Sequence, residues 1–293
     1  MKTILISGAT GILGTRTLNR LSREDVKVLA LCHDSSAVET YDNVKPITFE
    51  EFYDLNSKIN DLEVLHLACP RKSDAESVMG GINFTHSFLA KALELGASRI
   101  VESSSQSVYD PYRKSPALET DVVCPVNLYG VAKYYSEKWI SDFAKFNNIQ
   151  AIHLRLSSLV GPSYTKRLTA RMTNAAFQGE ELSVNNIKDR FSFLHLDDCV
   201  EAIVTVLLNP NKEHCVYNIG TSESYNLEEV ACEIDRQMYE ACGKHVSYVV
   251  NKNDKEGINR SISVDRFMND YGWVPKYTLH EIIKEEFEKN REL

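Results

Sequence analysis

The first twenty-one residues constrain the fold of this chain more than any other stretch. Residues 4–6 form an apolar run typical of a buried parallel strand, glycines stand at positions 8, 11 and 14, and a helical pattern continues to Leu21. Glycine lets the backbone approach a ligand closely because it has no Cβ. The helix N-terminus offers free N–H groups that suit a pyrophosphate. The stretch predicts a dinucleotide site, and its alternative is a glycine-rich turn of another α/β protein.

Strands and helices alternate through the first half of the sequence. The predicted strands are apolar runs at residues 4–6, 26–31, 44–48, 63–68, 99–105 and 151–154. The predicted helices follow the glycine turn and cover residues 77–95 and 127–146. Such alternation gives a parallel sheet with helices on both faces. We therefore expect a Rossmann-type α/β fold with a doubly wound parallel sheet over residues 1–155.

The pattern changes after Arg155, where Gly161-Pro162 interrupts the chain. The expected helices cover residues 165–177, 197–208 with Asp197 as N-cap, 227–239 with Asn226 as N-cap, and the stretch from 279 onward. Strands are expected at 191–196 and 216–220. No long linker separates the halves, so residues 192–217 are expected to return to the Rossmann domain. Residues 156–191 and 218–293 then form a smaller, interleaved α/β substrate region.

Composition excludes several classes of protein. The chain of 293 residues carries a net charge of −8, and no run of Lys or Arg stands out, which argues against a nucleic-acid partner. Seven cysteines occur without a Cys-x-x-Cys pair, which argues against a disulfide frame or a metal site. No apolar run reaches membrane-spanning length, and the N-terminus enters a strand directly. We expect a cytoplasmic protein with no membrane partner.

Tyr129 and Lys133 stand four residues apart on a predicted helix, so their side chains share one face. A free tyrosine has a pKa of about 10, and a neighbouring ammonium lowers it. The pair is therefore a candidate general acid/base. Its alternative is a chance spacing on an amphipathic helix.

Ser103, Ser104 and Ser105 end the predicted strand at 99–105, at the sheet edge where ligands of parallel sheets bind. A serine there can hydrogen-bond a substrate oxygen and share a proton with Tyr129. The alternative is a strand-end loop in which serines cap backbone groups.

These pieces occur in the order found in the extended short-chain dehydrogenase/reductase family, and the chain resembles its nucleotide-sugar epimerase/dehydratase branch over nearly its whole length. The shared motifs are the glycine turn, His66-Leu67-Ala68, Asn83, Ser103-Ser104-Ser105, Pro125 before Tyr129 and Lys133, Leu154-Arg155, Gly161-Pro162, His195-Leu196-Asp197-Asp198, Tyr217-Asn218-Ile219-Gly220, Leu227-Glu228-Glu229-Val230 and Gly272-Trp273-Val274-Pro275.

The resemblance implies roles for individual residues. It identifies Ser105, Tyr129 and Lys133 as catalytic. The implied cofactor-binding residues are Gly8, Thr10, Gly11, Ile12, Leu13, Gly14, His33, Leu67, Ala68, Cys69, Ser103, Tyr129, Lys133 and Leu156. The implied substrate-binding residues are Ser105, Ser158, Arg190 and Arg260. The two arginines would bind the diphosphate of a sugar-nucleotide. The alternative for both arginines is an exposed or ion-paired surface residue.

The chain departs from its relatives at informative positions. Gln106 and Ser107 replace the acidic pair of the dehydratases, so dehydration is disfavoured. Cys32-His33-Asp34 ends the second predicted strand, where a carboxylate selects NAD and an arginine selects NADP. Asp34 suits NAD and Arg16 suits NADP, so the cofactor is NAD or NADP.

Three functions remain open at this point. The first is an NAD(P)-dependent epimerase that oxidises C4 of a nucleotide-sugar transiently and returns the hydride to the other face. The second is an NADPH-dependent reductase of a keto-sugar or another carbonyl compound. The third is a dinucleotide sensor without turnover. Relatives often form homodimers through the helix that carries Tyr129 and its neighbour. Trp139 and Phe143 are candidates for the interface, and their alternative is packing in the core.

Overall fold

The computed structural model describes residues 1–68, 70, 74–210, 213–251 and 256–292. The chain divides into two compact units. The first comprises Met1–Tyr109, Val123–Arg155 and Val200–Tyr217, and the second comprises Asp110–Val122, Leu156–Cys199 and Asn218–Leu293. Among the described residues, no helix combines the length and apolar character needed to cross a membrane.

The large sheet has seven strands within the described residues, in the order β11-β6-β5-β4-β1-β2-β3. The strands are β1 (Thr3–Ser7), β2 (Lys27–Cys32), β3 (Val44–Thr48), β4 (Leu62–His66), β5 (Ala97–Ser105), β6 (Gln150–Leu156) and β11 (Val216–Ile219). From β3 to β5, neighbouring strands run parallel. The strand order reverses between β1 and β4, whose ends align because Ser7 lies opposite His66. Ligands of parallel sheets bind outside such a switch point.

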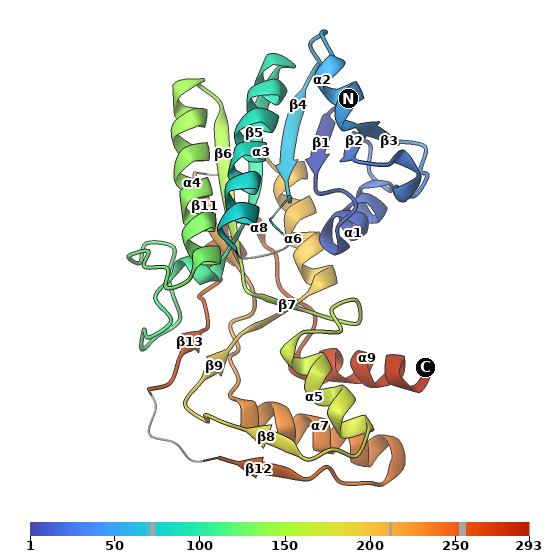
Figure 1. Cartoon of the computed structure of the whole chain (residues 1–293), viewed down its shortest axis with the longest axis vertical. Helices are drawn as coiled ribbons and strands as arrows, with labels where there is room; N and C mark the ends of the chain where they lie inside the picture. Colours follow the sequence, from blue (N-terminus) through green and yellow to red (C-terminus); the bar gives the residue numbers. More distant parts are fainter. Residues whose placement is uncertain (69, 71–73, 211–212, 252–255, 293) are drawn as a thin grey trace. The chain divides into compact units, whose positions relative to one another are not determined.

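Helices cover both faces of this sheet (Figure 1). The helices are α1 (Ile12–Leu21), α2 (Phe49–Asp54), α3 (Ala75–Glu94), α4 (Leu128–Phe146) and α6 (Leu196–Leu208), with single 3₁₀ turns η1 (Ser35–Ala37) and η2 (Gln106–Val108). Helices α2, α3 and α4 contribute to one core with the sheet, and α1 lies on the opposite face. The doubly wound parallel sheet predicted from the sequence is confirmed.

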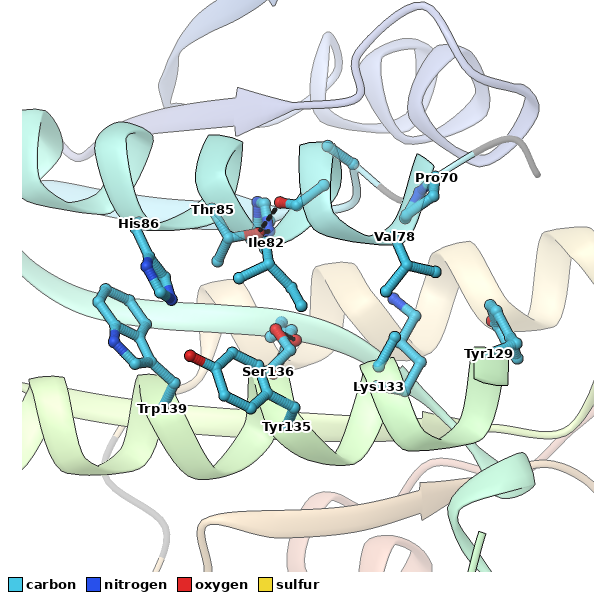
Figure 2. A pocket seen from close by; sticks show the side chains of 15 residues that line it. Pro70, Val78, Ile82, Thr85, His86, Tyr129, Lys133, Tyr135, Ser136 and Trp139 are labelled. Carbon is cyan, nitrogen blue, oxygen red and sulfur yellow. Dashed lines mark hydrogen bonds between the residues drawn. The ribbon is translucent and has the colours of Figure 1, made fainter. Parts of the chain in front are cut away.

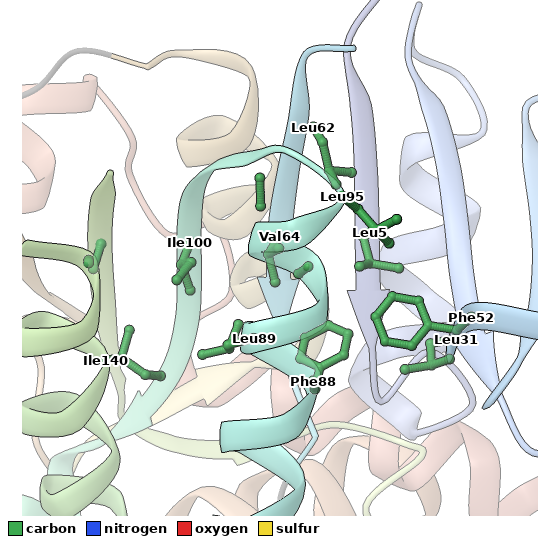
Figure 3. Packing of buried hydrophobic residues seen from close by; sticks show 14 of the residues in the cluster. Leu5, Leu31, Phe52, Leu62, Val64, Phe88, Leu89, Leu95, Ile100 and Ile140 are labelled. Carbon is green, nitrogen blue, oxygen red and sulfur yellow. The ribbon is translucent and has the colours of Figure 1, made fainter. Parts of the chain in front are cut away.

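An apolar core lies between the sheet and the helices α2, α3 and α4. Phe52, Phe88 and Leu89 point from the helices onto Val64 and other apolar residues of the sheet, as Figure 3 shows. Phe52 and Phe88 are fully buried and their ring centroids are 5.5 Å apart. Full burial of one such side chain stabilises the fold by roughly 1.5–3 kcal/mol. The packing fixes α3 and α4 side by side above β4 and β5.

The second unit is built from four helices and three two-stranded parallel pairs within its described residues. The helices are α5 (Leu168–Phe177), α7 (Leu227–Cys242), α8 (Asp265–Tyr271) and α9 (Leu279–Glu292). The strand pairs are β7 (Ser158–Val160) with β10 (Phe193–His195), β8 (Leu182–Val184) with β12 (Tyr248–Val250), and β9 (Arg190–Phe191) with β13 (Asn259–Arg260). Apolar residues of α5, α7 and α9 share a core that includes Val184, Phe193, Ile234 and Ile283.

The structure corrects some local predictions. Asp197 does not cap a helix, because α6 already begins at Leu196. Its neighbour Asp198 instead accepts hydrogen bonds from the backbone N–H groups of Lys276 and Tyr277 at 3.0 Å. The predicted strand 191–196 divides at Ser192, whose side chain donates to the Thr221 carbonyl at 3.1 Å. Asn226 caps α7 as predicted, within a capping box closed by Glu229.

The division of the chain also differs from the expected boundaries in two places. Residues Asp110–Val122 belong to the second unit, and the chain returns to the first unit at Val200 rather than at residue 192. The first difference has a local cause, because Ala117 exchanges backbone hydrogen bonds with Ser261 and Ser263. The periodicity of the sequence does not predict such a backbone pairing between two loops.

Candidate active site

The glycine turn joins β1 to α1 as predicted. Gly8 has φ = +73°, and a Cβ at this position would lie 2.8 Å from the backbone nitrogen of Ala68. Only glycine fits this conformation and this approach without strain. Gly11 occupies the N-cap of α1, and no side chain caps the helix. The first turn of α1 therefore offers backbone N–H groups at the switch point of the sheet.

A buried histidine joins the ends of β1 and β4 below this turn. His66 Nδ1 lies 2.6 Å from Ser7 Oγ, and its Nε2 lies 3.0 Å from Thr85 Oγ1 on α3. Ser7 also accepts a hydrogen bond of 3.4 Å from the N–H of Ala68. Burial lowers the pKa of His66 to about 4, and the charge of Lys133 acts in the same direction. His66 is therefore neutral near pH 7, and it holds the predicted cofactor segment at Leu67 and Ala68 against Gly8.

Tyr129 and Lys133 line one cavity between α3 and α4. The cavity is bounded by His66, Ala68, Pro70, Val78, Gly81, Ile82, Thr85, His86, Glu102, Tyr129, Ala132, Lys133, Tyr135, Ser136 and Trp139. Figure 2 shows Tyr129 and Lys133 toward the end marked by Pro70, with His86 and Trp139 at the other end. Lys133 is 8% exposed, and its ammonium donates to the Ser103 carbonyl at 2.7 Å. The tyrosine and the ammonium thus share a sheltered space beside the end of β4.

Ser105 ends β5 and is buried. Its hydroxyl accepts a hydrogen bond of 3.2 Å from the N–H of Ser107, so it caps η2. The capping role considered for these serines is therefore present at Ser105. A Cβ at Gly130 would lie 2.2 Å from the Ser107 carbonyl oxygen, so glycine lets the first turn of α4 pack directly against η2. This contact brings the segment after Ser105 next to Tyr129.

Buried charges fix α4 on the sheet. Arg155 on β6 donates from Nη2 to Glu137 Oε2 at 2.7 Å and from Nη1 to the Tyr109 hydroxyl at 2.9 Å. Glu137 also accepts a hydrogen bond from the Ser104 hydroxyl. Burial lowers the pKa of Arg155, but the hydrogen bonds and charge of Glu137 outweigh burial and raise it overall. The network connects α4, β5, β6 and the end of η2 around the catalytic candidates.

The end of β2 places its three candidate residues differently. The Cys32 thiol is buried and donates to the Ile47 carbonyl at 3.5 Å. His33 is exposed, and its ring centroid lies 4.5 Å from that of Phe49. Asp34 caps η1 by accepting from the N–H of Ser36 at 2.9 Å. His33 and Asp34 are therefore the exposed residues of this set at the strand end.

Four predicted residues lie in the second unit. Leu156 is buried at the end of β6, and Ser158 is half-buried on β7. Arg190 and Arg260 lie on the paired strands β9 and β13, where Asn259 is the partner of Arg190. Arg190 forms an exposed ion pair with Glu229 at 2.8 Å, and Arg260 lies over the ring of Phe191. The two guanidinium groups thus come from adjacent strands, although 70 residues separate them in sequence.

The remaining predicted positions surround the glycine turn, with one exception. Thr10 is exposed before α1, Ile12 and Leu13 begin the helix, and Gly14 is buried within it. Ser103 is buried, and its hydroxyl donates to the His66 carbonyl at 3.4 Å. Cys69 lies outside the described residues.

The arrangement fits a dinucleotide. The turn at Gly8 leaves no room for a side chain, and the N-terminus of α1 has no side-chain cap that would compete with a phosphate. Ala68 and the pair of Tyr129 and Lys133 border the cavity that begins at the end of β4. These groups match a pyrophosphate at the helix and a nicotinamide ribose at the ammonium.

Sequence reasoning gave no role to Glu137, Arg155 or Glu102, all of which are buried near the site. Glu137 stands four residues after Lys133, which is the same helical spacing that revealed Tyr129 and Lys133. Arg155 and Glu102 interrupt apolar strand patterns, which is a signal of a paired buried charge. Their partners could not be read from the sequence.

Comparisons with known proteins find one family profile and several relatives that act on nucleotide-sugars. The profile of the family described as NAD dependent epimerase/dehydratase matches residues 4–220. ADP-L-glycero-D-manno-heptose-6-epimerase of Brachyspira hyodysenteriae is 25% identical over 78% of this chain and 79% of its own length. The dTDP-4-dehydro-6-deoxyglucose reductase of Escherichia coli is 20% identical over 94% of this chain and 93% of its own length.

A solved structure with the same fold is that of a tyrosine-to-phenylalanine mutant of UDP-glucuronic acid 4-epimerase from Bacillus cereus, in complex with NAD and UDP-4-deoxy-4-fluoro-glucuronic acid. It superposes with a TM-score of 0.81 at 18% identity, and the alignment covers 99% of both chains. The fold expected from the sequence is thus shared over nearly the full length.

Proposed function

The chain belongs to the NAD dependent epimerase/dehydratase family, and from this premise we propose that it is an NAD(P)-dependent epimerase of a nucleotide-sugar that acts at C4. The observation that carries the proposal is the shared cavity of Tyr129 and Lys133, which begins beside Ala68 at the end of β4. A general acid/base, its cationic partner and the glycine turn then belong to one unit of the structure.

The roles of the residues follow from their chemistry. A nicotinamide dinucleotide held at the glycine turn would supply the hydride acceptor and donor that the epimerisation needs. Tyr129 removes the proton of the sugar hydroxyl and gives it back, and the Lys133 ammonium favours the phenolate form that this step needs. Ser105 accepts from Ser107 in the η2 cap, and its own O–H donates a hydrogen bond to the same sugar oxygen. Gly8, Gly11 and the first turn of α1 bind the pyrophosphate.

The substrate side of the proposal rests on the second unit. Arg190 and Arg260 lie on adjacent strands, one position apart in register, so their side chains leave opposite faces of the strand pair. Either guanidinium by its own geometry suits a phosphate of a nucleotide-sugar. The B. cereus relative is a UDP-sugar epimerase in complex with NAD, which supports a UDP-sugar as the first substrate to test. Gln106 and Ser107 on η2 supply no carboxylic acid, so the chain lacks at these positions the acid that would expel water in a dehydratase.

The reductase is the second candidate, because the E. coli relative that matches over almost the whole chain is a reductase of a keto-sugar. Both activities use Tyr129 and Lys133, but they differ in cofactor balance. An epimerase restores its dinucleotide in every cycle, whereas a reductase consumes one NADPH per turnover.

The deciding experiment starts with protein purified without added dinucleotide. We expect an absorbance spectrum that shows retained cofactor, and NMR spectra that show a UDP-hexose and its C4 epimer reaching equilibrium without net NAD(P)H change. Loss of cofactor together with stoichiometric NADPH oxidation on a 4-keto-sugar would establish the reductase. Dinucleotide binding without either reaction would establish the sensor.

We also propose that the protein forms a homodimer through α3 and α4. Large apolar side chains on these helices are exposed, namely Met79, Leu128, Val131 and Tyr135. Trp139 and Phe143, the interface candidates from the sequence, are half-buried; they stack on each other at 5.0 Å and also pack against the core. Sedimentation velocity should give a dimer that Val131→Asp dissociates, and a monomer at all concentrations would contradict the dimer.

A further inference from the structure

A buried carboxylate lies beside the ammonium of Lys133. Glu102 is on β5, is 1% exposed and lines the same cavity as Lys133. The carbonyl that accepts the Lys133 ammonium at 2.7 Å belongs to Ser103, the next residue of the strand. The carboxylate and the ammonium therefore border the same cavity, and their charges interact.

Hydrogen bonds hold Glu102 in place from two elements. His153 Nδ1 on β6 lies 2.7 Å from Glu102 Oε2, and the Ser136 hydroxyl on α4 donates to Oε1. His153 Nε2 in turn lies 2.9 Å from the Ser141 hydroxyl, also on α4. Ser136 is one helical turn beyond Lys133, so this network fixes the part of α4 that carries the ammonium.

The carboxylate keeps its charge. Burial raises the pKa of Glu102, but the hydrogen bonds and charge of His153, the charge of Lys133 and the hydrogen bond of Ser136 outweigh burial and lower it overall. The titratable groups around Glu102 are Lys133 from α4, His153 from β6 and His66 from β4. Helix α3 contributes His86 to the wall of the same cavity.

We propose that Glu102 is a positioning residue for the reaction, which anchors α4 beside Lys133 and opposes the field of the Lys133 ammonium at the Tyr129 hydroxyl. An unopposed ammonium favours the phenolate strongly and so weakens the return of the proton to the sugar. A carboxylate behind the ammonium reduces this effect, which keeps Tyr129 effective in both directions of proton transfer. The role of Tyr129 rests on the proposed function, but the electrostatic effect does not require turnover.

The test is Glu102→Gln, which keeps the shape of the side chain and removes its charge. The ionisation of Tyr129 is followed as the phenolate absorbance of the protein minus that of the same protein with Tyr129→Phe. We expect the midpoint of this titration to fall by roughly half to one pH unit in Glu102→Gln. The acid limb of kcat against pH should move in the same direction. A midpoint that stays or rises would overturn the proposal.

The matched control is Glu63→Gln, since Glu63 is another buried carboxylate of the same sheet, paired with Lys2 and Arg99. This control should lower stability without moving the Tyr129 midpoint; an equal shift would show a merely structural effect and overturn the proposal. If Glu102→Gln does not fold, Glu102→Leu removes the same charge while His153 keeps its contact with Ser141, and it should shift the midpoint in the same direction. A shifted midpoint without turnover would contradict the proposed function alone, and turnover with an unshifted midpoint would contradict the role of Glu102 alone.

Discussion

The guanidinium of Arg155 on β6 forms hydrogen bonds with both carboxylate oxygens of Glu137 on α4, at 2.9 Å from Nε to Oε1 and 2.7 Å from Nη2 to Oε2. The two side chains are 5% and 4% exposed. The pair holds the helix of Tyr129 and Lys133 on the sheet, and it lies next to the serines that end β5.

Removal of this pair's acid should destabilise the protein strongly. We expect Glu137→Ala to lower the free energy of unfolding by about 3–5 kcal/mol, because it leaves the Arg155 charge buried without its partner. Urea denaturation followed by circular dichroism measures the change. The control is Glu201→Ala, which removes a partly exposed ion pair with Arg20 and should cost less than about 1 kcal/mol. Equal losses in both variants would contradict the buried-charge argument.

Tyr129→Phe should abolish most turnover while it leaves the dinucleotide bound. Loss of a general acid/base reduces kcat by about 10²–10⁴-fold. Steady-state kinetics with a UDP-hexose and the absorbance of retained cofactor measure the two properties. Tyr134→Phe, on the same helix, is the control and should retain activity. Full activity in Tyr129→Phe would remove this residue from the mechanism.

Gly8→Val should weaken dinucleotide binding at least tenfold. The valine would have to adopt φ = +73°, and its Cβ would lie 2.8 Å from the backbone nitrogen of Ala68, so the glycine turn has to open. Isothermal titration with NAD and with NADP measures the change and also decides between these cofactors. Gly179→Val is the matched control, because Gly179 has φ = +77° but has no atom within 4 Å of the new Cβ. The Gly179→Val variant should have the same backbone strain as Gly8→Val but bind the dinucleotide with unchanged affinity.

Glu286 makes the stability of the second unit depend on pH. Its carboxyl is buried between α9 and α5, where Thr169 and Thr173 donate to it at 2.7 and 3.1 Å. Burial raises its pKa from 4.5 to about 7. The folded state therefore binds more protons than the unfolded state between these values, so this contribution is complete below pH 4.5 and is lost as the pH rises toward 7.

Glu286→Gln should remove that dependence. We expect the variant to gain up to roughly 3 kcal/mol relative to the wild type at pH 8, and little at pH 4.5. Urea denaturation at a series of pH values measures the difference. Glu288→Gln, at an exposed position of the same helix, is the control and should change stability by the same amount at every pH. A constant difference across the range would show that Glu286 does not titrate as described.

Arg190→Ala and Arg260→Ala should each weaken UDP binding by about 10- to 150-fold, since a charge-assisted hydrogen bond contributes roughly 1.5–3 kcal/mol. Titration calorimetry at two salt concentrations measures affinity and its ionic component. Arg236→Ala removes another exposed arginine of the second unit, paired with Glu233, and should leave the affinity unchanged. Unchanged affinity in the first two variants would assign Arg190 to its ion pair with Glu229 alone.

The sequence predicted the elements around the glycine turn well, because local pattern and fold agree there. Strand β3 begins and ends at the predicted residues, and α4 lies within one residue of its predicted start. The short helix α2 and the capping box between Thr48 and Glu51 that starts it went unpredicted. The two-residue strands β9 and β13 are too short to carry periodicity, so their pairing is a tertiary feature.

By itself, the amino-acid sequence determined the parallel sheet, the glycine turn and the helical spacing of Tyr129 and Lys133, since each depends on residues that are close along the chain. Only the tertiary structure decided which charges meet in the interior. Glu102 finds His153, and Glu137 finds Arg155, because β5, β6 and α4 pack together. A buried charge requires a partner, but the fold alone selects the partner, since the two residues come from separate elements of the chain.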